Sequence, residues 1–386
     1  MSVLSDADGF SIKRWTMGST SGKIVAGAVL VAALAAGYGV MSNLGMFAKM
    51  PEVSYLTENE AAQRPVYSML DKKEQAVYEA LYRGITIKKE YIPLPYEIDG
   101  DTYSKIYCIF EKQEGRFFYL GSSYYTAQKV RQAQIAYRDD IDKADEMTDE
   151  FTNAELAAID EIAGQDSEYE KVRAINDYIV KNCVYVTGED IEYSATAYGC
   201  LVEKRANCEG YAKAFSVLAA DFGLESILVT GKTDKGENHA WNQVKVDGEW
   251  YNIDVTWADN DNGDEVRHAY FLCSDKDFSE THIRSTENFT PFECTCEDNN
   301  YYVKNKLYVD EEADARYIIK KAVEKGQKSI EMKFSCQSLY KDFKSKYIRD
   351  QEIFDLLTES GMDFVSTMTV SVREGEGNNC VVLEIG

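Results

Sequence analysis

The chain has 386 residues, of which 45% are hydrophobic, 28% charged and 12% aromatic. This length predicts two or three domains, and 27 Tyr with 16 Phe are too many large apolar side chains for a disordered protein. Acidic residues outnumber basic residues by 66 to 42, and the net charge of −24 repels phosphate backbones. We therefore expect no nucleic acid among the partners.

Residues 24–47 depart from the pattern of a soluble protein. The segment opens with eighteen uncharged residues, close to the shortest stretch that spans a bilayer, and three basic residues precede it, Lys13, Arg14 and Lys23. These features predict a transmembrane signal-anchor over 24–47, a short cytoplasmic segment over 1–23 and an extracytoplasmic remainder at the cell surface. Cleaved secretion is the alternative, because residues 33–35 (ALA) form a small-x-small cleavage site.

The nine cysteines are an odd number. Outside a reducing cytosol, this count predicts disulfide pairs with one thiol left free. No CxxC pair exists and the chain has only three His, so we expect no metal site and no cofactor.

An accessory region is predicted over 48–150. Its pattern indicates a short helix over Ala76–Tyr82, a strand-rich stretch that includes Ile106-Tyr107, and a helix that starts over Ala127–Arg138. The acidic run 139–161 is expected to form the solvated face of a helix. Two capping-box patterns follow, Thr152 with Glu155 and Ser167 with Glu170.

The middle of the chain, 151–290, predicts a helix followed by strands. Apolar spacing indicates a helix that begins at Cys208 and ends at Gly223. A buried strand over 226–230 comes next, and two alternating runs joined by Asp247-Gly248 predict a type I′ hairpin. A helix followed by hairpin strands, without βαβ repetition, favours an α+β fold.

The last region, 297–386, is predicted to be a small α/β module. Its expected elements are strands over 301–309, a helix over 311–325, a strand over 329–334, a helical stretch over 338–360, and closing strands over 364–373 and 380–385. No chemistry is visible in this module.

Cys208, His239 and Asp254 form the candidate catalytic set. A helix N-terminus favours a thiolate at Cys208, and an imidazole can take the thiol proton. Adjacent hairpin strands would bring Asp254 to the His239 ring, where it fixes the tautomer. Taken singly, each residue also has a structural explanation: a lone Cys is often buried or disulfide-bonded, and a lone His is often structural. Spacing alone leaves both interpretations open.

The motifs around these residues add a resemblance. NCEGYAKAF around Cys208, HAWN at His239 and DGEWYNIDVTW around Asp254 occur in this order, and the stretch 152–283 resembles the transglutaminase-like superfamily in its bacterial, papain-like form. The resemblance implies a core in which a Cys-bearing helix packs on an antiparallel sheet. It implies that Cys208 is the nucleophile, His239 the general base and acid, and Asp254 the orienting group. Asn207 departs from the small or apolar residue found before the nucleophile in many relatives.

Other polar and aromatic residues have weaker assignments. Trp241, Trp257 and Tyr198 are candidate cleft residues, with core packing as the alternative. The acidic loop 259–265 does not fit an EF-hand register and is expected to be a solvated turn. His268 and His282 have no partners in sequence and are expected to be structural.

Together these features predict a membrane-anchored, extracytoplasmic enzyme that acts on amide bonds through a Cys208 thioester, as a peptidase, an amidase or a transamidase. Its partner would be a protein or peptide substrate, with a cell-envelope peptide as one possibility. A catalytically inactive surface adhesion or scaffold protein with the same fold is the alternative.

Overall fold

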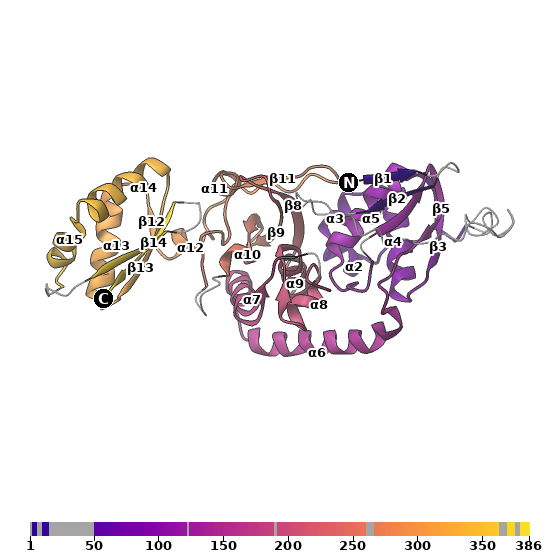
Figure 1. Cartoon of the computed structure of the whole chain (residues 1–386), viewed down its shortest axis with the longest axis horizontal. Coiled ribbons are helices and arrows are strands. Elements are labelled where there is room, and N and C mark those ends of the chain that lie inside the picture. The colour runs from indigo at the N-terminus through magenta and orange to yellow at the C-terminus, as the bar shows by residue number, and fades with distance from the viewer. Residues whose placement is uncertain are drawn as a thin grey trace.

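The computed structural model describes residues 2–5, 10–14, 50–121, 123–188, 191–259, 266–362, 369–374 and 379–386. Figure 1 shows three regions along the long axis: the accessory region at one end, the Cys208 region in the middle and the C-terminal module at the other end. The accessory and Cys208 regions share one hydrophobic core, whereas most of the C-terminal module has a core of its own.

The accessory region combines helices with short sheets. Its helices are α2 (Glu58–Ala62), α3 (Pro65–Met69), α4 (Lys72–Thr86) and α5 (Gly100–Gln113). Its strands are β3 (Tyr91–Asp99), β4 (Ser123–Ala127) and β5 (Lys129–Gln134), with β3 paired to β5. The helix predicted over Ala76–Tyr82 is confirmed within α4.

Two predictions in this region are wrong. Ile106-Tyr107 lies in α5 rather than in a strand, because the buried residues Tyr103, Ile106, Tyr107 and Phe110 follow helical spacing. The helix over 127–138 is also wrong, since β4 ends at Ala127 and β5 covers 129–134. In β5 the pairing with β3, rather than local propensity, determines the conformation.

The N-terminal strands bear on the predicted membrane topology. β1 (Ser2–Ser5) pairs with β2 (Phe10–Arg14), and β2 pairs with β4. That pairing puts residues 10–14 beside the accessory region, whereas a single crossing by 24–47 would place them on opposite sides of a membrane. The segment 24–47 itself lies outside the described residues. Among the helices of the described ranges, none has the length and apolarity needed to cross a bilayer.

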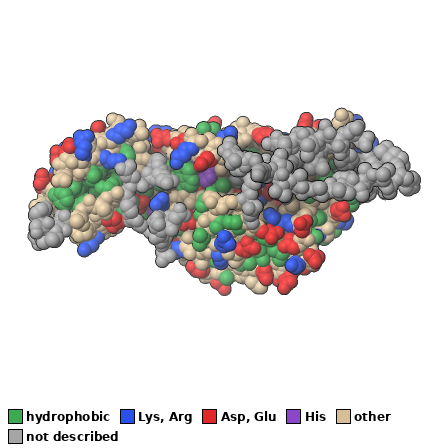
Figure 2. All heavy atoms as spheres, in the orientation of Figure 1, with side chains coloured by type: hydrophobic (Ala, Val, Ile, Leu, Met, Phe, Trp, Pro, Cys, Tyr) green, Lys and Arg blue, Asp and Glu red, His purple; other side chains and the backbone are tan. Residues whose placement is uncertain are grey.

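Helix α6 (Ala144–Ile162) runs beneath both the accessory and the Cys208 regions (Figure 1). The predicted boundary at residue 150 therefore falls inside a helix. The capping box at Thr152 is wrong, because Thr152 lies within α6 and its hydroxyl donates to the Thr148 carbonyl at 2.8 Å. Figure 2 shows acidic side chains gathered on the lower face, where Figure 1 places α6, in agreement with the expected solvated face.

The Cys208 region is an α+β unit, as predicted. Strands β10 (Glu249–Ile253), β9 (Asn238–Val246), β8 (Ser226–Thr233) and β11 (His282–Arg284) form an antiparallel sheet in that order. Helix α9 (Cys208–Asp221) packs on β8 and β9. The remaining elements are α7 (Glu168–Asn182), β6 (Val184–Tyr185), α8 (Ala197–Leu201), β7 (Arg205–Ala206), α10 (Val255–Ala258) and α11 (Asp275–Phe278).

Three local signals in this region are confirmed. Ser167 and Glu170 form the capping box of α7. Gly223 follows α9 with φ +74°, as expected of a glycine that ends a helix. Asp247 and Gly248 have φ values of 53° and 90°, so the β9–β10 turn is the predicted type I′ hairpin.

The C-terminal module has the sheet order β12-β13-β15-β14. Its elements are α12 (Tyr301–Lys304), β12 (Tyr308–Val309), α13 (Glu312–Glu324), β13 (Ser329–Phe334), α14 (Gln337–Phe343), a π-helical turn (Lys344–Arg349), α15 (Ile353–Glu359), β14 (Val370–Glu374) and β15 (Cys380–Ile385). The strand predicted over 301–309 is wrong in its first half, which is α12. The other predicted elements are present where the structure describes them; residues 363–368 lie outside the described ranges.

All nine cysteines are free thiols, so the predicted disulfide pairing is wrong. Seven are buried; Cys183 and Cys200 contact each other, and others contact polar groups. The Cys294 thiol, for example, lies 3.3 Å from the Gln243 amide nitrogen. Apart from Cys208, the buried thiols therefore act as small side chains of the core.

Candidate active site

Cys208 is the first residue of α9. Asn207 caps this helix, and its Oδ1 accepts from the backbone N–H groups of Glu209 at 3.0 Å and Gly210 at 3.2 Å. The cap leaves the N–H of Cys208 itself outside its reach, at a terminus that carries partial positive charge. Asn207, which departs from the family pattern, therefore has a clear local role.

His239 lies between Cys208 and Asp254. The His239 Nε2 atom is 2.7 Å from Asp254 Oδ2, and the Cys208 side chain lies close enough to His239 to raise the pKa of its ring. Because Nε2 is engaged by the carboxylate, Nδ1 is the ring nitrogen left for the thiol. The structure thus brings together the three residues that the sequence predicted as a set.

The charges of the His–Asp pair follow from burial and contact. Burial alone would lower the pKa of His239, but the Asp254 carboxylate and the Cys208 side chain together raise it to about 10. Burial would likewise raise the pKa of Asp254, yet His239 and His282 hold it far below its usual value. The pair is therefore an imidazolium and a carboxylate at neutral pH.

Asp254 is held by its own backbone neighbourhood. It is the N-cap of α10, and its Oδ1 accepts from Thr256 N at 2.9 Å and Trp257 N at 3.1 Å. Its exposure is 1%. The helix cap thus occupies one carboxylate oxygen and leaves the other, Oδ2, for His239.

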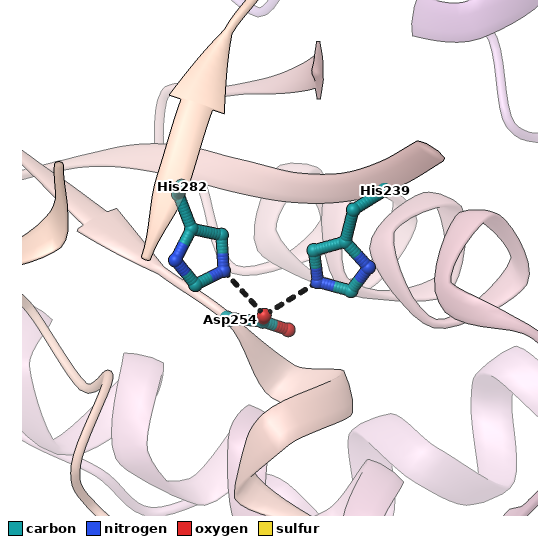
Figure 3. Close-up of side chains that lie close together, drawn as sticks. All are labelled: His239, Asp254 and His282. Carbon is teal, nitrogen blue, oxygen red and sulfur yellow. Dashed lines mark hydrogen bonds and ion pairs between the residues drawn. The ribbon is translucent and has the colours of Figure 1, made fainter. Parts of the chain in front are cut away.

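His282, which has no partner in the sequence pattern and was expected to be structural, is in contact with Asp254. It comes from β11, and its Nε2 lies 3.0 Å from the same Asp254 Oδ2 (Figure 3). Only the pairing of β11 with β8 brings it to the site, since His282↔Thr233 are partners across these strands. No local pattern around His282 carried this information.

His239, Asp254 and His282 also place three potential metal ligands within 4.8 Å of one another. Their spacing fits hydrogen bonds better than coordination. Ligands 2.0–2.2 Å from a tetrahedral ion lie about 3.4 Å apart, whereas both histidine nitrogens are at 2.7 and 3.0 Å from one oxygen. The cluster is therefore a hydrogen-bonded unit.

The three predicted cleft residues have different positions. Trp241 is 2% exposed and lies with its ring centre 6.2 Å from His239, so it packs behind the histidine. Trp257 is partly exposed, 5.4 Å from the His239 ring centre, and remains a candidate cleft wall. Tyr198 instead stacks on Phe118 at 4.7 Å and donates to Glu150, in a separate aromatic cluster.

Two further sequence assignments can be followed into the structure. His268 stacks on the Tyr301 ring at 3.7 Å, in agreement with a structural role. In the acidic loop, Asp259 accepts from the Tyr211 hydroxyl, and residues 260–265 lie outside the part that the structure describes.

The accessory region contacts the helix that carries Cys208. Lys112 of α5 pairs with Glu209, the residue after Cys208, at 2.6 Å. The side-chain amide of Gln113 pairs with both the N–H and the C=O of Leu228, at 3.0 and 2.8 Å. Leu228 belongs to the small apolar cluster around Cys208, with Ala212 and Ala240. The accessory region thus helps to hold both α9 and β8 in place.

The sheet requires glycine at position 231, and we therefore expect a larger side chain there to destabilise the protein. Gly231 faces His239 across β8 and β9, and a Cβ here would lie 2.2 Å from the Ile283 carbonyl and 2.7 Å from the Trp241 ring. Gly231→Ala must push β11 away from β8, and we expect about 1–3 kcal/mol of destabilisation from this overpacking. Urea unfolding measures it. The exposed neighbour Lys232 supplies the control, Lys232→Ala, and equal stability of the two variants would contradict the prediction.

Comparisons with known proteins agree with this geometry. Residues 157–255 match the family model of the transglutaminase-like superfamily. The match ends at Val255, so this transglutaminase-like region contains all three predicted catalytic residues but not His282.

Two relatives are the kyphoscoliosis peptidases of Mus musculus and Homo sapiens. They are 28% and 27% identical over 167 and 168 residues, which is 37% of this chain and 25% of each relative. Two solved structures, a TGase and a candidate cysteine protease from Cytophaga hutchinsonii, are 18% and 17% identical. Their TM-scores are 0.26 and 0.27, and the alignments cover 41% and 42% of this chain and 47% and 55% of theirs. At these TM-scores neither structure supports an argument about mechanism.

Proposed function

We propose that the chain is a thiol-dependent enzyme that cleaves or exchanges amide bonds in a protein or peptide substrate. The observation that carries this proposal is the connected set Cys208–His239–Asp254, with the thiol at a helix N-terminus and a buried carboxylate behind the imidazole. The match to the transglutaminase-like superfamily supports the same chemistry.

The reaction follows from this arrangement. The Cys208 thiolate attacks the amide carbonyl carbon, and the oxyanion that forms accepts from the Cys208 N–H at the start of α9. His239 then gives a proton to the leaving amine as the carbon–nitrogen bond breaks, which leaves a thioester on Cys208. An acyl acceptor, either water or an amine, then attacks this thioester while His239 takes the acceptor's proton. The carbon–sulfur bond breaks and the Cys208 thiolate is restored.

The acceptor decides between hydrolysis and transamidation. Water gives a carboxylic acid and makes the enzyme a peptidase or amidase, whereas an amine gives a new amide. We favour hydrolysis because water is abundant and the buried residues that form the apolar cluster with Cys208, namely Ala212, Leu228 and Ala240, have no charged side chain that would bind an amine.

Alkylation of Cys208 by iodoacetamide tests the proposal without a known substrate. Mass spectrometry would follow the rate from about pH 4 to about pH 9, in wild type and in His239→Ala. Because the His239 ring stays protonated up to a pKa of about 10, we expect fast alkylation well below the ordinary thiol pKa of about 8.5. This advantage should disappear in His239→Ala.

The exposed Cys336 lies in the C-terminal module and serves as an internal reference for a solvent-accessible thiol. If Cys208 reacted only at alkaline pH and regardless of His239, the triad would not be active, and the chain would be better described as a binding module. A second measurement, with a peptide library as substrate, should show turnover in wild type and none in Cys208→Ala.

A further inference from the structure

The His282 ring lies in a box of aromatic side chains behind the triad. Its centre is 3.9 Å from Phe278, 4.5 Å from Trp257, and 5.1 Å from both Trp241 and Tyr270. The His282 side chain has no exposed surface. A polar ring in such surroundings costs free energy unless its nitrogens are hydrogen bonded, so its polar neighbours, Asp254, the Thr281 hydroxyl and the Phe278 backbone, define what it does.

Those partners fix its protonation state. His282 Nε2 faces Asp254 Oδ2 at 3.0 Å, and His282 Nδ1 faces the Thr281 hydroxyl at 2.9 Å. An ionised carboxylate can only accept, so Nε2 must carry a proton. Burial, helped by the charge of His239, lowers the pKa of His282 against the opposing effects of Asp254 and the Phe278 backbone, and the titratable groups facing the ring are Asp254, His239 and Tyr270. The ring is therefore neutral at neutral pH, and Nδ1 accepts from the Thr281 hydroxyl.

This neutral donor completes the hydrogen bonds of Asp254. Oδ1 accepts from the N–H groups of Thr256 and Trp257, and Oδ2 accepts from His239 and His282. A carboxylate offers about four acceptor sites, and here all four are used. The carboxylate cannot rotate without breaking bonds in a buried site, so Oδ2 is held where His239 needs it (Figure 3).

We propose that His282 is a positioning residue of the catalytic site, a neutral imidazole that locks the Asp254 carboxylate toward His239. It acts through Asp254 and does not touch the reacting atoms. The inference rests on the proposed function for its catalytic consequence, while the hydrogen-bonded unit itself stands on the geometry alone.

Removal of the His282 N–H changes the pKa of Asp254 in a predictable direction. A hydrogen bond to the ionised form stabilises it, so the His282 N–H lowers the pKa of Asp254. Without this donor, Asp254 takes up a proton at a higher pH. A carboxylate that is held less firmly toward His239 is a weaker counter-charge for the imidazolium, and the thiolate–imidazolium pair with Cys208 is weakened in turn.

His282→Phe is the test variant, because phenylalanine keeps a ring in the aromatic box and removes the N–H. In the iodoacetamide experiment we expect the acid limb of the Cys208 profile to move to higher pH by about one unit, as loss of one charge-assisted hydrogen bond implies. His282→Gln retains a side-chain donor and should recover part of this shift. Ile283→Ala, on the opposite face of β11 and 60% exposed, is the matched control and should leave the profile unchanged.

A purely space-filling role predicts the same acid limb in His282→Phe as in wild type, and that result in a folded variant would overturn the proposal. If the Phe variant does not fold, ¹⁵N-histidine NMR of the wild-type chain decides the question. We expect one buried histidine that stays neutral with the proton on Nε2 at neutral pH; an Nδ1–H tautomer or an imidazolium at His282 would overturn the proposal. Because NMR does not depend on thiol reactivity, an inactive Cys208 would reject the proposed function without deciding the role of His282.

Discussion

Asp254→Asn is expected to cause the largest loss of reactivity that leaves Cys208 in place. The asparagine Oδ1 can still cap α10, but its NH₂ group would then point at the two histidine nitrogens that donate to Asp254. Two donors cannot pair, so His239 must lose the Nε2 proton and keep its remaining proton on Nδ1. That tautomer cannot accept the thiol proton, and we expect turnover to fall on the order of 10⁴-fold, as in a Ser-His-Asp triad that loses its carboxylate.

The measurement is single-turnover acylation, or the alkylation rate of Cys208 where no substrate is at hand. Asp247→Asn is the matched control, because Asp247 lies at the hairpin turn with φ 53°, a conformation that asparagine also adopts. Wild-type reactivity in Asp254→Asn would show that the carboxylate plays no part in the chemistry.

The same pair predicts how stability depends on pH. The pKa of His239 is raised from 6.5 to about 10, so its contribution to stability is complete below about pH 6.5 and is lost as the pH rises through about 10. The pKa of Asp254 is lowered from 3.8, so its contribution is complete above about pH 4 and is lost as the pH falls further. We expect the free energy of unfolding, measured in urea, to decline from about pH 6.5 to about pH 10 in wild type. Asp254→Asn should flatten this decline, and an equal slope in both proteins would contradict the assignment.

The parts of the site that the sequence predicted are those encoded locally. The apolar spacing and the terminal glycine predict the helix that begins at Cys208. The Asp247-Gly248 pair predicts the hairpin. Because a two-residue turn fixes the register of both strands, the sequence also brings His239 and Asp254 close together. The short motifs around Cys208, His239 and Asp254 then identify the three residues as one catalytic set.

The missed features depend on contacts between distant segments. His282 reaches Asp254 only because β11 adds to the edge of β8, and a three-residue strand leaves no pattern in the sequence. The misassigned segments over 106–107 and 127–138 are short runs where helix and strand periodicity compete, and pairing of β5 with β3 decides the second of them. The disulfide prediction failed for another reason: the cysteine count carries no information on which thiols meet in the fold.

Lys333→Met is expected to cause the largest loss of stability. Lys333 lies on β13 of the C-terminal module with 1% exposure, and its Nζ is 2.6 Å from Asp277 Oδ2 on α11 of the Cys208 region. Burial alone would lower the pKa of Lys333, but Cys273, Cys380 and Asp277 raise it. Burial raises the pKa of the Cys380 thiol to about 12, so this thiol is neutral at neutral pH. Asp277 is the carboxylate in direct contact with the ammonium.

Removal of the lysine leaves the Asp277 carboxylate, only 11% exposed, without its partner. Breaking one side of such a pair costs about 3–5 kcal/mol, whereas replacing both charges by apolar side chains is often close to neutral. We therefore expect Lys333→Met to lower the free energy of unfolding strongly and Lys333→Met/Asp277→Leu to recover most of the loss. Lys328→Met, at an exposed position just before β13, is the matched control.

The double variant also separates two roles of the C-terminal module. Asp277 precedes Phe278, whose ring packs on His282 at 3.9 Å, so a displaced α11 would reach the triad through His282. If the double variant regains stability but the acid limb of Cys208 alkylation stays shifted, the ion pair positions α11 for catalysis as well as joining the module to the sheet. If both recover, the pair serves stability alone. Failure of the double variant to recover stability would show that the two charges do not compensate one another.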